Sequence, residues 1–381
     1  MLPVYLIVFS AFFDTHAQMP VLAPYAVTLG ATPFMLGLVV GSYSLFNIVG
    51  NFLAGATIDW RSWKLPLFLG LFGVSLILVL YTRADSAMHL VLIRAGHGFM
   101  GGLLVPAALA CLTGEQGGSA FHGSRLAFFG AAIGLAAVTG PLVAGIIANR
   151  YGYHAVYYSL SILMFAAAIA ASALLGNQVA CSRNASPFRI STRQIYARSN
   201  MLSAFLFAFG TMGSTGALAS FLPARAEMLG FNHAQTGMLF ATFALLAIIV
   251  QILWPGKLKP LLKEDWRGCF FGLILLCLSL VLAATLNNAS GLFSALILFG
   301  IGFGLSFQGM LGLVVEDSRP GWRGRAIGLF FAVYSLGVAV VPPLSGLIWQ
   351  YLPAIFPFYT AAAAALISLL AGSYFAQKRI I

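Results

Sequence analysis

Four ionisable side chains lie inside long apolar runs of the sequence. Asp14 and His16 fall in AFFDTHAQMP (11–20), and Arg94 and His97 fall in RAGHGFMGG (94–102). A carboxylate within a hydrocarbon environment costs at least ~2.5–3.5 kcal/mol on insertion scales, so such residues are by default functional. Arg94 and His97 are three residues apart and therefore share one face of a helix.

The chemistry expected of Asp14 is reversible protonation. A low-dielectric surrounding favours the neutral carboxyl and a nearby guanidinium favours the carboxylate, so a changing distance to Arg94 would load and release a proton. Gln18 follows Asp14 by four residues and shares its helical face. The alternative is a static charge pair that only fixes two helices. His16 and His97 are candidate proton or substrate groups, because histidine titrates near neutral pH, or else buried hydrogen-bonding residues. Their spacing predicts no metal site.

The composition places these residues in a membrane. Of 381 residues, 60% are hydrophobic and 8% are charged, whereas an ordinary soluble domain has about 25% charged residues. No soluble fold of this length can bury so much apolar surface. The net charge of +11 does not indicate nucleic-acid binding, because the basic residues fall in short gaps between apolar runs, where they set topology.

Twelve apolar runs are long enough to cross a bilayer, which takes about 20 helical residues. With both termini cytoplasmic, sixteen of the twenty lysines and arginines lie in cytoplasmic gaps or in the first turn of a span beside them, and three lie in external gaps, as the positive-inside rule requires. We predict an all-α membrane protein with an N-terminal six-helix bundle (1–176), a cytoplasmic linker (177–199) and a C-terminal six-helix bundle (200–381). The predicted spans are 3–25, 35–58, 65–82, 88–112, 122–148, 154–176, 200–224, 235–256, 268–286, 291–315, 324–348 and 354–376.

The two halves of the chain repeat each other. LGATPFMLG (29–37) aligns with LGFNHAQTG (229–237) at an offset of 200, and Pro141 and Gly145 align with Pro342 and Gly346 at 201. Six spans separate the partners, so the repeats have the same orientation in the membrane. Parallel six-helix repeats are the architecture of two-bundle secondary transporters.

Three motifs resemble signatures of the major facilitator superfamily. GATIDWRSWKLP (55–66) resembles its cytoplasmic Gly-x-x-x-Asp signature, although Trp60 and Trp63 occupy places that are usually basic or glycine. RAGHGFMGG (94–102) resembles an Arg-x-x-x-Gly-x-Gly motif, and GAAIGLAAVTGPLVAG (130–145) resembles the Gly-Pro signature of the family's antiporters. The resemblance implies twelve helices in two bundles that work by alternating access, with spans 1, 4, 7 and 10 lining a central cavity.

The resemblance also implies roles for further residues. The first and third motifs supply the candidate gating residues Gly55, Asp59, Arg61, Lys64, Gly130, Gly134, Gly140, Pro141 and Gly145. Alternatively, the charges of the first motif are only solvated charges at a helix end, and the third motif serves only tight helix packing. Polar residues within the spans are candidates for the substrate cavity, or alternatively bond between helices: Gln18, Asn47, Asn51, Thr211, Ser214, Thr215, Gln251, Gln308 and Tyr334.

The expected function is transport. The chain has no Gly-x-x-x-x-Gly-Lys-Ser/Thr phosphate loop, so we expect neither ATP drive nor an enzyme, and no cofactor beyond a proton gradient. We predict a monomeric proton-coupled antiporter in a bacterial plasma membrane that exports a small amphipathic drug or secreted metabolite. The alternatives are a lipid or lysolipid flippase and a proton-coupled importer or passive facilitator of a small polar solute.

Overall fold

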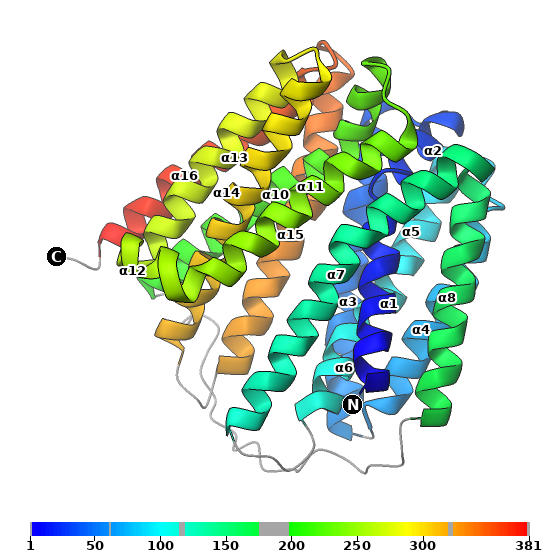
Figure 1. The fold of residues 1–381 in the computed structure, drawn as a ribbon, viewed down its shortest axis with the longest axis horizontal. Coiled ribbons are helices and arrows are strands. Elements are labelled where there is room, and N and C mark those ends of the chain that lie inside the picture. The colour runs from blue at the N-terminus through cyan, green and yellow to red at the C-terminus, as the bar shows by residue number, and fades with distance from the viewer. Residues whose placement is uncertain (1, 61, 114–118, 175–197, 319–322, 379–381) are drawn as a thin grey trace. The chain divides into compact units, whose positions relative to one another are not determined.

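The protein is all-helical in the part of the chain that the structure describes. The computed structural model describes residues 2–60, 62–113, 119–174, 198–318 and 323–378, which contain helices and no strand (Figure 1). The predicted fold class is therefore confirmed. The predicted linker lies almost entirely outside the described residues, so the predicted domain boundaries stay a prediction.

Backbone contacts divide the chain into two compact units. Unit 1 comprises Met1–Ala31, Ser42–Ala185 and Gly230–Ala241, and unit 2 comprises Thr32–Gly41, Ser186–Leu229 and Thr242–Ile381. The first half of the chain forms α1 (Leu2–Ala17), α2 (Leu22–Thr28), α3 (Pro33–Trp60), α4 (Lys64–Tyr81), α5 (Ala87–Gly102), α6 (Leu104–Thr113), α7 (Ser119–Tyr151) and α8 (Tyr153–Leu174). The second half forms α10 (Ser199–Met228), α11 (His233–Leu253), η1 (Trp254–Leu258), α12 (Lys259–Leu262), α13 (Asp265–Thr285), α14 (Ala289–Asp317), α15 (Arg323–Trp349) and α16 (Phe356–Gln377).

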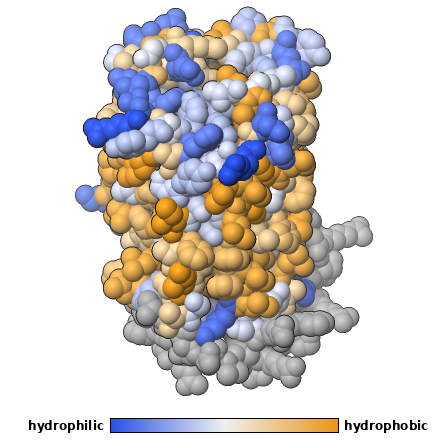
Figure 2. Space-filling view, turned by 90° about the vertical axis from the view of Figure 1, so that its right-hand side faces the viewer, coloured by the Kyte–Doolittle hydropathy of each residue, from blue (hydrophilic) through white to orange (hydrophobic). Residues whose placement is uncertain are grey.

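The predicted count of membrane spans is confirmed. Among the described residues, 11 helical segments are long and apolar enough to cross a membrane, and the bent pair α1–α2 makes up to 12. Large apolar side chains on these helices face outward, including Phe52 and Ile162, which are 68% and 69% exposed. Figure 2 shows one face with a broad hydrophobic band across its middle and lower part and hydrophilic residues gathered over its upper part. Lipid tails are the environment that accommodates such a surface.

Two predicted spans are each broken into two helices. The first bends by 46° between α1 and α2, and the fourth is interrupted at Leu103 between α5 and α6. Pro20 and Pro106 explain these breaks, because proline lacks the backbone N–H and its ring clashes with the carbonyl four residues earlier. The first break puts Asp14 in the last turn of α1 and Gln18 immediately after it.

The sequence repeat is reproduced in backbone contacts. In unit 1, a Cβ atom added at Gly237 would collide with the Pro141 carbonyl, and in unit 2 one at Gly37 would collide with the Pro342 carbonyl. The two contacts are related by the predicted offsets of 200 and 201. Gly30 and Gly230 likewise share positive φ angles of 78° and 81°, which glycine adopts without strain.

Glycines also set the distances between the helices that carry the candidate site. A Cβ at Gly98 of α5 would overlap the Tyr43 carbonyl of α3, and one at Gly50 of α3 would overlap the Phe99 carbonyl of α5. The backbones of α3 and α5 therefore approach closely, as small residues allow in membrane helices. A Cβ at Gly140 of α7 would lie 3.0 Å from the Ala17 backbone nitrogen, so α7 packs against the end of α1.

Candidate functional site

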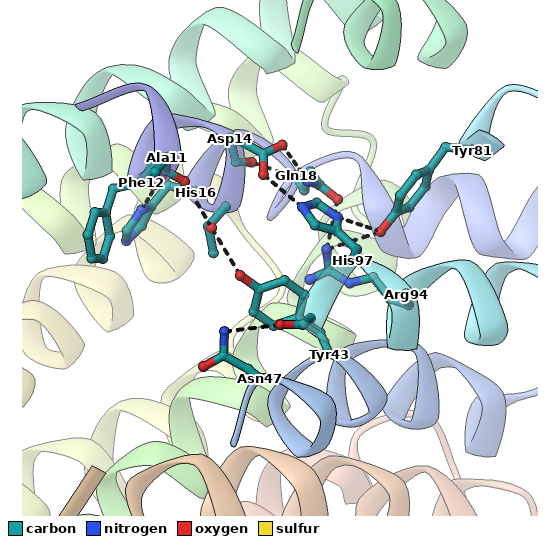
Figure 3. A network of polar contacts seen from close by, with 12 residues as sticks. Ala11, Phe12, Asp14, His16, Gln18, Tyr43, Asn47, Tyr81, Arg94 and His97 are labelled. Atoms are coloured by element: carbon teal, nitrogen blue, oxygen red, sulfur yellow. Dashed lines mark hydrogen bonds and ion pairs between the residues drawn. The ribbon is translucent and has the colours of Figure 1, made fainter. Parts of the chain in front are cut away.

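A buried polar network joins three segments of unit 1 (Figure 3). Asp14 and Gln18 come from the end of α1, Tyr81 ends α4, and Arg94 and His97 lie one turn apart on α5. None of the five is more than 5% exposed. The helix break after α1 places Gln18 beside Asp14 and Arg94, and the ends of α1 and α4 meet α5 at this point.

Both carboxylate oxygens of Asp14 have a partner. Oδ2 lies 2.9 Å from Nε2 of His97, and Oδ1 accepts a 2.8 Å hydrogen bond from Nε2 of Gln18. Asp14 is 2% exposed and His97 is fully buried. A buried charge is tolerated when it is paired and hydrogen-bonded, and both conditions are met here.

Gln18 stands between Asp14 and Arg94, and this corrects the expected direct pair. Its amide oxygen accepts a 2.8 Å hydrogen bond from Nη1 of Arg94, while its amide nitrogen donates to Asp14. The side chain can bridge a cation and an anion because an amide presents a donor and an acceptor. The carboxylate and the guanidinium therefore interact through Gln18, and His97 takes the direct contact with Asp14.

His97 connects Asp14 to Tyr81 through its two ring nitrogens. Nδ1 lies 3.0 Å from the Tyr81 hydroxyl, which also accepts a 3.3 Å hydrogen bond from Nη1 of Arg94. The plane of the imidazole ring is nearly perpendicular to the Tyr43 and Tyr81 rings, with interplanar angles of 85° and 84°. The guanidinium carbon of Arg94 stacks 4.5 Å from the centre of the Tyr43 ring, a favourable cation–π geometry.

The network is neutral when His97 is neutral, because the charges of Asp14 and Arg94 cancel. Addition of one proton to the Asp14–His97 pair leaves a net charge of +1 among groups that water does not reach. Coulomb energies are several-fold larger at such a position than in water. One proton more or less on this pair therefore changes the electrostatic energy of the network more than it would in water.

An exposed pair provides a reference on the same chain. His89 Nδ1 lies 2.8 Å from Asp85 Oδ1, and the two side chains are 51% and 79% exposed. The hydrogen bond from His89 lowers the pKa of the Asp85 carboxyl below its usual value. The chemistry matches that of Asp14 and His97, whereas the surroundings are aqueous.

The remaining candidates of the first half lie outside this network. Nδ1 of His16 is 2.7 Å from the Phe12 carbonyl of its own helix, so this half-buried histidine has a partner. Asn47 donates to the Gly98 carbonyl at 3.3 Å, and Asn51 donates to Asn47 at 2.8 Å. Asn47 therefore bonds between α3 and α5, as the alternative expected, whereas the bond of Asn51 stays within α3; their roles in a cavity stay a prediction.

Candidates of the second half lie in unit 2. Thr211 and Ser214 are fully buried on α10, and Thr215 bonds to the Thr211 carbonyl at 2.8 Å. Gln251 and Gln308 are half-buried on α11 and α14. Tyr334 packs against the rings of Phe307, Phe330 and Phe331. Their roles in substrate binding stay a prediction.

The candidate gating residues are only partly described. Arg61 and the side chain of Asp59 lie outside the described part, and Lys64 is the half-buried first residue of α4. A Cβ added at Gly55 would meet nothing within 4 Å. Gly130 is exposed, and a Cβ there would also meet nothing within 4 Å, so the alternative of tight helix packing does not apply at this glycine.

The other glycines of the third motif lie farther along α7. Gly140 meets α1, and Gly145 and Pro141 meet the start of α11 through the His233 carbonyl and Gly237. Gly134 is half-buried on α7. The gating roles themselves stay a prediction.

Sequence reasoning missed the tyrosines around the network. Tyr81 is fully buried, its ring stacks on Tyr157 at 4.5 Å, and its carbonyl accepts a 2.6 Å hydrogen bond from Tyr25. Tyrosine at the end of an apolar run is ordinarily an interfacial residue, so the sequence carried no signal that Tyr81 turns inward. No three His, Cys, Asp or Glu side chains group as metal ligands within the described ranges.

Comparisons with known proteins provide a family. A sequence profile described as Major Facilitator Superfamily matches residues 4–342. Multidrug efflux protein YfmO of Bacillus subtilis is 24% identical over 354 residues, which cover 92% of this chain and 86% of that protein. Inner membrane transport protein YajR of Escherichia coli is 26% identical over 345 residues, or 86% of this chain and 72% of that protein.

Solved structures agree on the fold. An inward-facing, occupied bacterial homologue of the human lysosomal transporter Spinster superposes with a TM-score of 0.79. The superposition covers 98% of this chain and 95% of that chain at 15% identity. At that identity the likeness concerns the fold alone.

Proposed function

Because this chain belongs to the major facilitator superfamily, we propose that it is a proton-coupled antiporter that exports a small amphipathic drug or secreted metabolite. Membership makes it a multi-pass membrane transporter and not an enzyme. Coupling to protons, direction and substrate are the parts that we propose. The family implies a small-molecule substrate as a partner. We propose protons as the second partner and a monomer as the working unit.

The proposal rests on the buried Asp14–His97 pair. A carboxylate that is 2% exposed and shares a 2.9 Å contact with a histidine can hold one proton in a water-free place. Ionisable groups within membrane spans mark proton and substrate pathways by default. In this mechanism, Asp14 takes a proton from the external side and releases it to the cytoplasm as the transporter alternates between its two openings.

Electrostatics supports exchange of a proton for a cationic substrate. The network of Asp14, Gln18, His97 and Arg94 is neutral without the transported proton and carries a net charge of +1 with it. A second positive charge nearby is disfavoured in a low-dielectric site. A proton and an amphipathic cation therefore exclude each other, and this exclusion is the requirement for antiport.

The export direction is supported by the name of the Bacillus subtilis relative, a multidrug efflux protein similar over 92% of this chain. The bias of lysine and arginine toward alternate gaps supports cytoplasmic termini. Together these observations favour a transporter of the bacterial plasma membrane that uses the inward proton gradient to move substrate out.

The test is uptake of ethidium, an amphipathic cation, into proteoliposomes with an acidic lumen. Wild-type protein accumulates the dye as protons leave, and Asp14→Asn equilibrates the dye without accumulating it. Asp85→Asn is the matched control, because it removes a carboxylate 2.8 Å from a histidine in an exposed place. Full accumulation by Asp14→Asn would show that Asp14 is not the coupling carboxylate.

A further inference from the structure

The hydrogen-bond chain from Asp14 to Tyr81 leads to one further inference, which rests on the proposed role of Asp14. We propose that His97 and Tyr81 form a relay through which the transported proton reaches Asp14, and that neutral His97 changes its tautomer as Asp14 takes up the proton. Tyr81 would then be a residue of the proton path.

The ionised state fixes one arrangement of hydrogens. A carboxylate only accepts hydrogen bonds, and a neutral imidazole carries one N–H. With Asp14 ionised, Nε2 of His97 must donate across the 2.9 Å contact. Nδ1 is then bare, so it accepts from the Tyr81 hydroxyl at 3.0 Å.

The protonated state fixes the reverse arrangement. Gln18 donates to Oδ1 of Asp14, and the contact between its amide oxygen and Arg94 keeps the amide in that orientation. The carboxyl proton therefore sits on Oδ2 and donates to Nε2 of His97. The imidazole hydrogen is then on Nδ1 and donates to the Tyr81 oxygen.

Passage between the two states needs no charged histidine. A proton from the aqueous phase binds the Tyr81 oxygen, the former hydroxyl hydrogen moves to Nδ1 of His97, and the hydrogen on Nε2 moves to Oδ2 of Asp14. Each O–H or N–H bond that breaks is replaced by one that forms, and the net result is one proton on Asp14. Release to the same side reverses the steps.

The surroundings bear on where a proton enters and on how His97 changes its tautomer. Neither end of the relay meets water in this conformation, because Asp14 is 2% exposed and Tyr81 is 0% exposed, so a proton enters only when the structure opens beside one of them. Rotation of the His97 ring is opposed by the flanking rings of Tyr43 and Tyr81, whose centres lie 5.3 and 5.7 Å away. Tyr81 is followed directly by residues 82–86, between α4 and α5, so it is the relay member nearest to a loop.

Other titratable groups near the relay bear on its pH dependence. Arg94 on α5 donates to the Tyr81 oxygen at 3.3 Å and so disfavours positive charge there, which requires that proton uptake by Tyr81 and transfer to His97 occur together. The titratable and charged groups that face the relay from the packed helices are Asp14 on α1, Tyr25 on α2, Tyr43 on α3, Arg94 on α5 and Tyr157 on α8. Among these, only Asp14 is a direct proton partner of Nε2.

The first test reads the tautomer of His97. The full-length protein in lipid bilayers is labelled with ¹⁵N-histidine and studied by solid-state NMR from about pH 5 to about pH 9, the range around the ordinary histidine transition. His97→Gln identifies the signals. We expect the N–H to move from Nε2 to Nδ1 as pH falls, and to stay on one nitrogen at every pH in Asp14→Asn. A doubly protonated imidazolium in the loaded state would overturn the relay.

The second test measures the rate of proton-driven ethidium uptake. Tyr81→Phe removes the hydroxyl and is expected to slow uptake by about tenfold or more, since a positioned proton-transfer group contributes about 10²–10⁴-fold to a rate. Tyr25→Phe is the matched control, because its hydroxyl donates to the Tyr81 backbone carbonyl and not to the relay. Wild-type rate in Tyr81→Phe, or equal slowing in Tyr25→Phe, would contradict the relay.

The two proposals can fail separately. An unchanged His97 tautomer together with loss of coupling in Asp14→Asn would refute the relay and leave the proposed function intact. Retained coupling in Asp14→Asn would refute both.

Discussion

Replacement of Gln18 with leucine tests the bridge between Asp14 and Arg94. Gln18 is 1% exposed, donates to Asp14 at 2.8 Å and accepts from Arg94 at 2.8 Å. Leucine is of similar size but makes neither bond. Hydrogen bonds to charged groups contribute about 1.5–3 kcal/mol each. We therefore expect Gln18→Leu to lower the free energy of unfolding by about 3–6 kcal/mol, from the sum of two such bonds.

The assay is reversible unfolding in sodium dodecyl sulfate, followed by far-UV circular dichroism. Asn51→Leu is the matched control, because Asn51 is half-buried and donates at 2.8 Å to the neutral side chain of Asn47. A neutral bond contributes about 1 kcal/mol, so the control is expected to lose several-fold less stability.

A double-mutant cycle isolates the contribution of the charge. In the Asp14→Asn background the bond to residue 14 is neutral, so Gln18→Leu should cost about 0.5–2 kcal/mol less than in the wild type. Equal costs in the two backgrounds, or a loss in Gln18→Leu no larger than in Asn51→Leu, would refute the bridge.

Two further predictions concern packing and pH. Gly237→Ala places a Cβ against the Pro141 carbonyl and should lower the free energy of unfolding by about 1–3 kcal/mol. Gly130→Ala is the control and should not, because its Cβ meets nothing within 4 Å. Equal melting temperatures of the two variants would contradict the close approach of Gly237 to Pro141. The lowered pKa of Asp85 means that stabilisation by the pair with His89 is present above the unfolded-state value of about 3.9 and is lost as pH falls through the lower folded-state value. Between about pH 5 and pH 8 the ionisation of Asp85 is therefore complete in both states, and Asp85→Asn should leave the pH profile of transport unchanged.

The spans were predictable because each is an apolar run of bilayer length, whereas their interruptions were harder to predict. Pro20 and Pro106 lie in runs whose hydropathy continues on both sides, and proline in a membrane helix can bend it or break it. The repeat was predictable from glycine and proline positions alone, because close backbone contacts such as Gly37 with Pro342 and Gly237 with Pro141 tolerate few other residues.

The members of the site were predictable, but their partners were not. Asp14, Arg94 and His97 stood out because ionisable residues are rare in apolar runs. Helical spacing places Arg94 and His97 on one face, yet it does not determine which of them reaches Asp14. That choice depends on the break after Ala17, which places Gln18 against Arg94, and on the inward turn of Tyr81, which a sequence pattern does not record.

The most direct test of proton coupling is the reverse experiment, in which substrate drives protons. Proteoliposomes loaded with ethidium are diluted into dye-free buffer without a pH gradient, and a trapped pH indicator follows the lumen. Wild-type protein should acidify the lumen as the dye leaves, and Asp14→Asn should release the dye with no change in pH. Lumenal acidification by Asp14→Asn at the wild-type rate would contradict the account.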